Sequence, residues 1–324
     1  MTKCSVVIPY YQRDAGILRR ALVSVFAQSH ANFDIIVVDD ESPCPLEPEL
    51  DGFSAQERAR IHIVTQKNAG PGAARNAGMD AVAADSDYVA FLDSDDEWTP
   101  DHLKIAVDHM SRFEADCYFA SISGGDAFYY HFGVSALSDV TNIVRLNDEP
   151  PIVEIPDIAS VMLRNWSFMH LSAMVIGARL FRTTRFEASL RLAAEDVLFF
   201  YECVRNSGRT ILSDAVGATR GEGINIFHGV DSASPLFLKQ QFNTWAALDR
   251  LGTRFSHGPD DRASIEAYKQ TARQQALWGQ ARLVRNRRAP QFRQLAHWAW
   301  RDPRIVTSAM RLAVGKLLPK AAQR

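Results

Sequence analysis

Cysteines are scarce in this 324-residue sequence, and long apolar runs are missing. The four cysteines, Cys4, Cys44, Cys117 and Cys203, form no C-x-x-C pair, so a zinc site is not expected. Scattered thiols suit a reducing compartment. No stretch reaches the length of about 18 consecutive apolar residues that predicts a membrane-spanning helix. The apolar run near the N-terminus is too short for the core of a signal peptide. These absences predict a globular protein of the cytoplasm.

Two nucleotide-binding signatures are absent or incomplete. No G-x-x-x-x-G-K-[ST] motif occurs, which excludes ATP or GTP hydrolysis by a P-loop. The segment 70–76, GPGAARN, lacks the glycine or alanine at the sixth place of a dinucleotide fingerprint. Acidic residues are scarce towards the C-terminus, where Asp302 is the one acid after Arg273 among many arginines and lysines. No recognised nucleic-acid motif accompanies these basic residues, so no nucleic-acid partner is expected.

Strands and helices alternate in the first hundred residues. Continuous apolar runs predict buried strands, and apolar residues at helical spacing predict amphipathic helices. This alternation predicts an α/β fold, with a mostly parallel, Rossmann-like sheet flanked by helices. Beyond about residue 232 the pattern becomes helical and basic, which predicts a C-terminal helical extension. The expected strands are 6–8, 33–38, 61–64 and 88–92, and the clearest expected helices are 17–26, 73–84 and 195–206.

Polar segments follow three of the expected strands. They are residues 9–11 (PYY), 39–40 (DD) and 93–96 (DSDD). Ligands bind at the carboxyl ends of the strands in open parallel sheets, so we expect these segments to line one site. The carboxylates of Asp93 and Asp95 can hold Mg²⁺ or Mn²⁺, with diphosphate oxygens completing the shell. Taken alone, each acidic segment is explained as well or better by a polar turn.

Three further features have competing interpretations. Glu195 and Asp196 open an amphipathic helix and suit a general base, but acids in a first turn commonly complement the helix dipole. Arg75, near a helix start, suits a contact with a phosphate or support of an aspartate, or is a surface side chain. An aromatic segment suits stacking on sugar rings, although aromatic residues are more often core. Its members are Trp166, Phe168 and His170.

Five segments together resemble the large family 2 of glycosyltransferases, which has the GT-A fold. The resemblance implies a catalytic domain over residues 1–231, with a nucleotide-sugar-binding half (1–98) and an acceptor half (99–231). The helical basic region 232–324 follows it. The opening stretch also resembles glucosyltransferases of bacterial exopolysaccharide assembly, such as those building succinoglycan. The matching segments, in the family's order, are 5–11 (SVVIPYY), 37–42 (VVDDES), 70–78 (GPGAARNAG), 91–96 (FLDSDD) and 195–196 (ED).

The resemblance implies donor-binding roles for several matching residues. Pro9 and Tyr11 would border the base of the nucleotide. Asp40 would contact the uracil with Asp39 nearby, and Arg75 would support that pocket. The family's usual glycine or asparagine after the second aspartate is a glutamate here, so this loop departs from the family pattern.

The resemblance also implies a metal site and a catalytic base. Asp93 and Asp95 form the family's D-x-D motif, in which Asp95 is the better candidate for direct metal contact. Asp93, with Ser94, would face the ribose, the diphosphate and the metal, which is Mg²⁺ or Mn²⁺. His228 would contact the metal or the diphosphate. The implied catalytic residues are Asp196 as the base and Glu195 beside it.

The implied reaction is inverting transfer of a hexose, with glucose expected, from a UDP-sugar to a saccharide acceptor. The acceptor is expected to be lipid-linked, as in synthesis of a bacterial exopolysaccharide or surface polysaccharide. Asp196 would take the proton of the acceptor hydroxyl as it attacks the anomeric carbon from the face opposite the diphosphate. Two alternatives stay open: a nucleotidyltransferase, which would release pyrophosphate, and a non-catalytic scaffold with a decayed nucleotide site.

The C-terminal region has an amphipathic, basic pattern. Val306 and Met310 fall on one helical stripe with Arg304 and Arg311 beside it, and Trp300 lies upstream. This pattern suits an interfacial helix resting on anionic lipid, which would place the protein peripherally on the inner membrane. The competing interpretation is a helical appendage that packs on the catalytic domain or across a homodimer.

Overall fold

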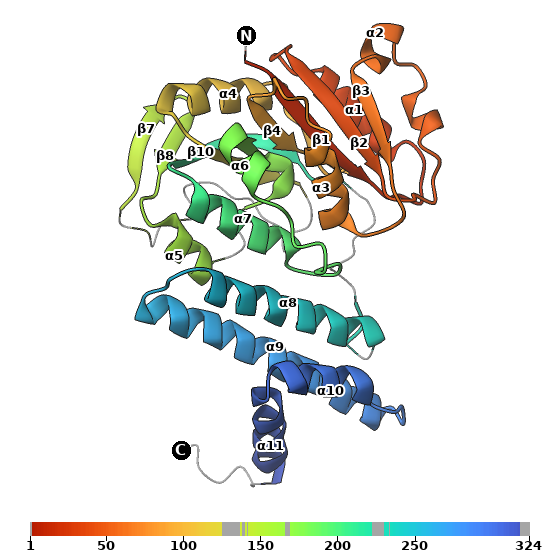
Figure 1. Ribbon diagram of the computed structural model, residues 1–324, viewed down its shortest axis with the longest axis vertical. Helices are drawn as coiled ribbons and strands as arrows, with labels where there is room; N and C mark the ends of the chain where they lie inside the picture. The colour runs from red at the N-terminus through yellow and green to blue at the C-terminus, as the bar shows by residue number, and fades with distance from the viewer. Residues whose placement is uncertain are drawn as a thin grey trace. The chain divides into compact units, whose positions relative to one another are not determined.

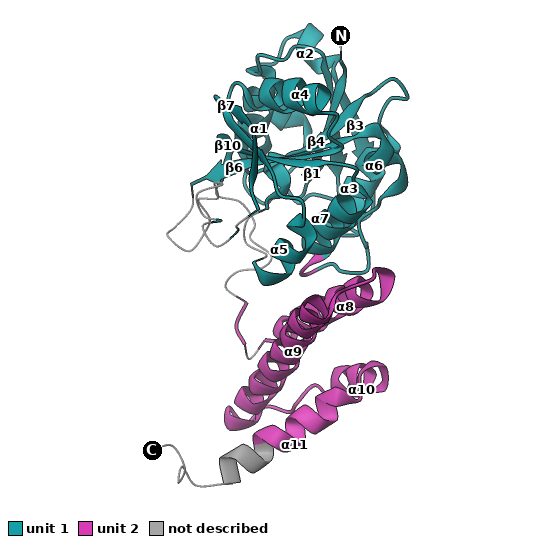
Figure 2. Ribbon diagram, turned by 90° about the vertical axis from the view of Figure 1, so that its left-hand side faces the viewer, with its two compact units in different colours: residues 1–191, 195–224 teal, residues 192–194, 225–324 magenta. Residues whose placement is uncertain are grey.

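A computed structural model of the chain divides into two compact units (Figure 2). The first comprises Met1–Arg191 with Glu195–Ile224, and the second comprises Leu192–Ala194 with Asn225–Arg324. The structure describes residues 2–124, 137, 140, 142–165, 169–221, 230–232 and 234–317, without the side chains of 313–317.

The first unit is built on a twisted mixed sheet (Figure 1). Its strand order is β3-β2-β1-β4-β9-β6-β10-β8-β7, and β5 also pairs with β10. The strands β3, β2, β1 and β4 are parallel, whereas β9 runs antiparallel between β4 and β6. The strands are β1 (Cys4–Tyr10), β2 (Phe33–Asp39), β3 (Ile61–Thr65), β4 (Tyr88–Phe91), β5 (Glu97–Trp98), β6 (Cys117–Ser123), β7 (Val144–Asp148), β8 (Pro151–Glu154), β9 (Met174–Gly177) and β10 (Thr210–Thr219).

Helices cover both faces of the sheet. Side chains alternate between the two faces along each strand, and the buried strands carry apolar side chains on both. Val6, Ile8 and Tyr10 of β1 are fully buried in one cluster with residues of α1 and α4. Val7 points to the opposite face, where a Cβ added to Gly78 of α3 would lie 2.4 Å from Val7 Cγ1. The helices of this unit are α1 (Ile17–Phe26), α2 (Ala55–Arg58), α3 (Pro71–Asp80), α4 (His102–Phe113), α5 (Ile158–Arg164), α6 (Ala178–Thr183) and α7 (Glu195–Asn206).

The expected α/β architecture is confirmed, and α7 has the predicted bounds. The first strand, however, continues through Pro9 to Tyr10 instead of ending before the proline. Val7 accepts a hydrogen bond from Leu92 N, so Pro9, two residues further on, faces the same neighbour. The pairing of β1 with β4 ends at Val7, so the missing N–H of Pro9 costs no ladder hydrogen bond there.

The second unit is helical, which confirms the predicted C-terminal helical extension. Trp298 is fully buried in it, with its ring centroid 5.4 Å from that of Phe242 and 5.9 Å from that of Trp245. No helix among the described residues is long and apolar enough to cross a membrane. The helices are α8 (Pro235–Arg254), α9 (Pro259–Arg285), α10 (Phe292–Arg301) and α11 (Arg304–Leu317).

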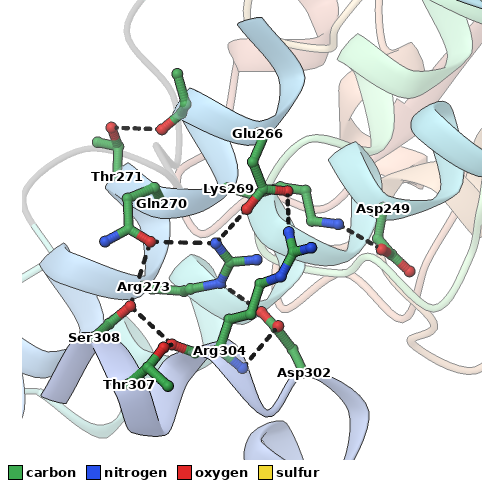
Figure 3. Close-up of polar contacts among 11 residues, drawn as sticks. Asp249, Glu266, Lys269, Gln270, Thr271, Arg273, Asp302, Arg304, Thr307 and Ser308 are labelled. Atoms are coloured by element: carbon green, nitrogen blue, oxygen red, sulfur yellow. Dashed lines mark hydrogen bonds and ion pairs between the residues drawn. The ribbon is translucent and has the colours of Figure 1, made fainter. Parts of the chain in front are cut away.

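A buried arginine ties α9 to the corner between α10 and α11 (Figure 3). The guanidinium of Arg273 donates to Asp302 Oδ2 at 2.6 Å and to Glu266 Oε1 at 2.8 Å. Arg304, at the start of α11, forms an ion pair with Glu266 at 2.9 Å. Because Asp302 accepts both from the buried Arg273 and from the backbone N–H of Arg304 at 3.3 Å, the network fixes the corner at which α11 leaves α10.

Candidate active site

The carboxyl ends of β1, β2 and β4 meet at one edge of the sheet. Gln12, just after β1, donates from Nε2 to Ser94 Oγ at 3.1 Å, beyond the end of β4. Its backbone N–H donates to Ser42 Oγ at 3.0 Å, beyond the end of β2. Pro9 and Tyr11 are half-buried at this edge. Asp40 N also donates to Tyr10 O at 3.0 Å, so the structure brings together the segments that follow the three strands.

Asp40 is buried and organises the loop before α3. Its Oδ1 accepts from Gln66 Nε2 at 2.7 Å and from Ala69 N at 2.8 Å, and its Oδ2 accepts from Gly70 N at 2.9 Å. A carboxylate has about four acceptor positions, so three contacts leave about one for a ligand. Asp40 thus holds this loop against the end of β2.

The residue that follows Asp40 has a left-handed backbone conformation although it is not a glycine. Glu41 has a φ of 59°, in the region that glycine and asparagine adopt most readily. Asp39 closes the turn, because its Oδ1 accepts from Ser42 N at 2.8 Å. Glu41 also accepts from Asn68 N at 3.2 Å. The glutamate that departs from the family pattern therefore retains the turn geometry and adds a contact to the facing loop.

Arg75 of α3 joins two acidic segments that lie about a hundred residues apart in the sequence. Its side chain is buried, so the interpretation as a surface arginine is wrong. Its Nη2 donates to Asp93 Oδ1 at 2.6 Å, and its Nη1 lies 3.5 Å from Glu195 Oε1. The guanidinium also lies over the ring of Phe186, 5.5 Å from its centroid. Burial alone would lower the pKa of Arg75, but the two carboxylates raise it, so the side chain stays charged.

A serine links the ends of the acidic turn after β4. Ser172 Oγ accepts from Asp93 N at 3.0 Å and donates to Asp96 Oδ2 at 2.6 Å. Asp96 Oδ1 accepts from Gly221 N at 3.0 Å. A Cβ added to Gly221 would lie 1.6 Å from the carbonyl oxygen of Asp95, so only glycine allows this approach. The turn is therefore fixed on both sides by segments from later in the chain.

A cluster that can hold a metal ion lies in this turn. Asp93, Asp96 and His170 each offer one ligand atom, and these atoms lie within 4.8 Å of one another. His170 Nδ1 is 3.7 Å from Asp96 Oδ2. Carboxylates suit Mg²⁺ and Mn²⁺, and imidazole suits transition metals, so this donor set fits a divalent cation. Asp95 is not a member of this cluster.

The charges around the turn explain its titration. Burial opposes ionisation of Asp93, but Arg75 and His170 lower its pKa. Burial and the negative charges of Asp96 and Asp93 raise the pKa of Asp95 to about 7. Negative potential therefore accumulates at Asp95, which a bound cation would relieve.

The sequence did not point to Asp96 or His170 as ligands. Asp96 had an ordinary explanation as part of a turn, and His170 lies 74 residues further on with no spacing signal. Stacking on sugar rings was one of two interpretations of the segment that contains His170, and the structure places this side chain beside Asp96. Two other residues of the aromatic segment, Trp166 and Phe168, lie outside the described residues. So does His228, the predicted contact to the metal or the diphosphate.

The acids at the start of α7, Glu195 and Asp196, lie beside Arg75 and helix α3. Glu195 is nearly buried, and burial together with the charge of Asp196 raises its pKa. A Cβ added to Gly72 of α3 would lie 3.3 Å from Glu195 Cγ, so α3 packs closely on this side chain. Asp196 is half-buried, and its Oδ1 accepts from Val197 N at 2.7 Å. That contact is what the helix-dipole interpretation predicts, and it leaves the second carboxylate oxygen for other chemistry.

Comparison with known sequences identifies the class of protein. Residues 5–167 match Glycosyl transferase family 2. The chain is 60% identical over 317 residues to the succinoglycan biosynthesis protein ExoW of Rhizobium meliloti (strain 1021), covering 98% of this chain and 99% of that protein. This chain therefore belongs to glycosyl transferase family 2, which confirms the resemblance seen in its motifs.

Two further similarities are more distant. The amylovoran biosynthesis glycosyltransferase AmsB of Erwinia amylovora is 31% identical over 174 residues, which cover 53% of this chain and 54% of AmsB. The crystal structure of S. aureus TarS 1-349 in complex with UDP superposes with a TM-score of 0.56 at 18% identity, covering 87% of this chain and 72% of that one. The TarS likeness shows the fold alone and confirms the predicted GT-A architecture.

Proposed function

We propose that this protein transfers glucose from UDP-glucose to a saccharide acceptor, with inversion, in the synthesis of a bacterial exopolysaccharide. The observation that carries the proposal is the pairing of Arg75 with both Asp93 and Glu195. It joins the D-x-D motif and the acids of α7 in a single site. Family membership supports the transferase activity. The name of the relative ExoW supports succinoglycan-type synthesis, and the complexes of TarS with UDP and UDP-GlcNAc support a UDP-sugar donor.

The donor base is assigned to the edge where β1 and β2 end. Pro9 and Tyr11 would border the uracil, and the remaining acceptor position of Asp40 would receive its N–H. Asp39 would lie nearby and hold the turn. Arg75 would support the pocket indirectly, by fixing Asp93 and the start of α7.

The diphosphate is assigned to the turn after β4. Asp93 and Asp96 would hold Mg²⁺ or Mn²⁺ together with His170, with Ser94 facing the donor. Asp95, which lies outside that cluster, stays a prediction as a direct metal contact. His228 stays a prediction as a further contact. A bound divalent cation would neutralise charge on the departing nucleoside diphosphate.

Asp196 is assigned as the general base. The acceptor hydroxyl would attack the anomeric carbon from the face opposite the diphosphate and give its proton to Asp196, while the bond to the diphosphate breaks. A single displacement converts an α-linked donor into a β-linked product. Glu195 would keep Arg75 in place beside the base, because its carboxyl lies 3.5 Å from that guanidinium.

The wider setting is also part of the proposal. Residues 1–231 would form the catalytic domain, with donor-binding (1–98) and acceptor (99–231) halves, and 232–324 would form the basic helical region. A lipid-linked acceptor would be met at the cytoplasmic face of the inner membrane, with peripheral contact through the C-terminal region. The competing proposal is that the C-terminal region forms the interface of a homodimer.

Turnover of UDP-glucose tests the proposal. Purified protein with Mn²⁺ and extracted lipid-linked saccharide should release free UDP; release of pyrophosphate would instead indicate a nucleotidyltransferase. Asp196→Asn should lower kcat by about 10²–10⁴-fold while UDP binding is retained. Glu195→Gln keeps the size of the neighbouring side chain and should lower kcat less. If Asp196→Asn turns over like the wild type, the assignment of the base is wrong.

A further inference from the structure

Helix α10 carries an apolar stripe that faces away from its own unit. Phe292, Ala296 and Trp300 follow one another at every fourth residue and are all exposed, with Phe292 at 69% and Trp300 at 80% exposure. Positions four apart share one face of a helix. Trp298, by contrast, is fully buried against Phe242. The helix therefore packs through one face and leaves a second apolar face uncovered in this unit.

A basic stripe lies directly beside the apolar one. Arg293 and Arg301 are each displaced by one residue from an apolar position and are exposed, and the exposed His297 lies between them with its ring centroid 5.5 Å from that of Phe242. No exposed carboxylate of this segment balances them, because the one acid after Arg273 is Asp302. The side chain of Asp302 is itself buried and paired with Arg273 at 2.6 Å.

Helix α11 repeats the arrangement. Val306 and Met310 are exposed at i and i+4, and Arg311 lies on another exposed side of the same helix, which it shares with Arg304, itself paired with Glu266 at 2.9 Å. The Arg273 network described above fixes the corner between α10 and α11 (Figure 3). The two helices thus present their apolar and basic side chains on a fixed element.

We propose that α10 and α11 form a docking surface for an anionic lipid bilayer. Phe292 and Trp300 would enter the boundary between headgroups and acyl chains, where aromatic rings are favoured. Arg293 and Arg301 would contact lipid phosphates. Charge favours a bilayer over a second copy of the chain. The same face of a second copy would bring arginines and no exposed acid from this segment to pair with them, whereas anionic lipid supplies negative charge. This surface rests on the proposed function, because it specifies which residues would make the peripheral membrane contact proposed above, but it binds lipid independently of the sugar donor.

Flotation of the full chain with vesicles tests this surface. The protein should bind vesicles containing phosphatidylglycerol, bind phosphatidylcholine vesicles weakly, and be released by salt because the attraction is screened. Phe292→Ser with Trp300→Ala should weaken binding at least about tenfold, since each buried aromatic side chain contributes substantially. Arg293→Gln with Arg301→Gln should weaken it about 25-fold, from about fivefold per arginine. Trp278→Ala, a half-exposed tryptophan on α9, is the matched control and should bind like the wild type.

Two outcomes would overturn the proposal. One is equal binding, or none, to the two kinds of vesicle by the well-folded wild type. The other is a dimer, seen by light scattering, that Trp300→Ala dissociates, because a second copy would then cover this face. UDP binding by calorimetry is measured on the same variants and should not change, so failure of the lipid surface is distinguishable from failure of the proposed function.

Discussion

Removing the charge of Arg75 should destabilise the fold far more than removing an exposed arginine. Arg75→Met keeps most of the side-chain volume but leaves Asp93 and Glu195 without their cation. Breaking a buried ion pair in this way costs about 3–5 kcal/mol. For a unit of this size each kcal/mol corresponds to about 2–4 °C, so the unfolding midpoint should fall by about 6–20 °C.

The destabilisation should also depend on pH. In the wild type Arg75 helps to lower the pKa of Asp93, so this pair stabilises the fold above the unfolded pKa of about 3.9 and loses that contribution as the pH falls through the folded pKa. Without the guanidinium, the pKa values of Asp93 and Glu195 rise. The free energy of unfolding of Arg75→Met should therefore decrease as the pH rises from about 4 to 8, because the unfolded chain ionises freely.

Differential scanning calorimetry at pH 5 and pH 8 measures both effects. Arg145→Met is the matched control, because Arg145 and Asp148 form a 3.2 Å pair with both side chains exposed, and such pairs contribute about 0–1 kcal/mol. Arg75→Lys retains the charge and keeps the test informative if Arg75→Met does not fold. A midpoint for Arg75→Met that matches the control, or a loss that is equal at both pH values, would refute the reasoning.

Two glycines offer further tests. Gly78→Ala should destabilise the first unit by about 1–3 kcal/mol, because its Cβ would lie 2.4 Å from Val7 Cγ1 in a packed core; in thermal unfolding, Gly258→Ala, with nothing within 4 Å, should stay close to the wild type. Gly221→Ala should displace the turn at Asp95 and weaken UDP binding measured with Mn²⁺ by about tenfold or more, from about 1–3 kcal/mol of overpacking. Unchanged binding would show that the approach of these two segments does not shape the donor site.

The sequence predicted the architecture of the first unit because its strands are continuous apolar runs. The convergence of the segments after β1, β2 and β4 followed from the topology of parallel sheets. The antiparallel course of β9 did not, since a short apolar run carries no signal of its direction. The passage of β1 through Pro9 also required the structure, because it depends on where β4 stops pairing.

Contacts within the site were less accessible from the sequence. Pattern alone offered three interpretations of Arg75, and burial beside Asp93 and Glu195 decided among them. The approach of His170 to Asp96 depends on a 3-10 turn at Leu171–Ala173 that brings Ser172 under the acidic turn. Such tertiary contacts leave no periodic signal in the chain.

Titration calorimetry with UDP and GDP, each with Mn²⁺, Mg²⁺ or EDTA, tests the central claim most directly. The account predicts that UDP binds in the presence of a divalent cation, that EDTA weakens this binding, and that GDP binds more weakly. Asp93→Asn should weaken the binding of UDP with Mn²⁺ and reduce the effect of EDTA. No binding of any nucleotide to well-folded protein would contradict the account and favour a scaffold without a working nucleotide site.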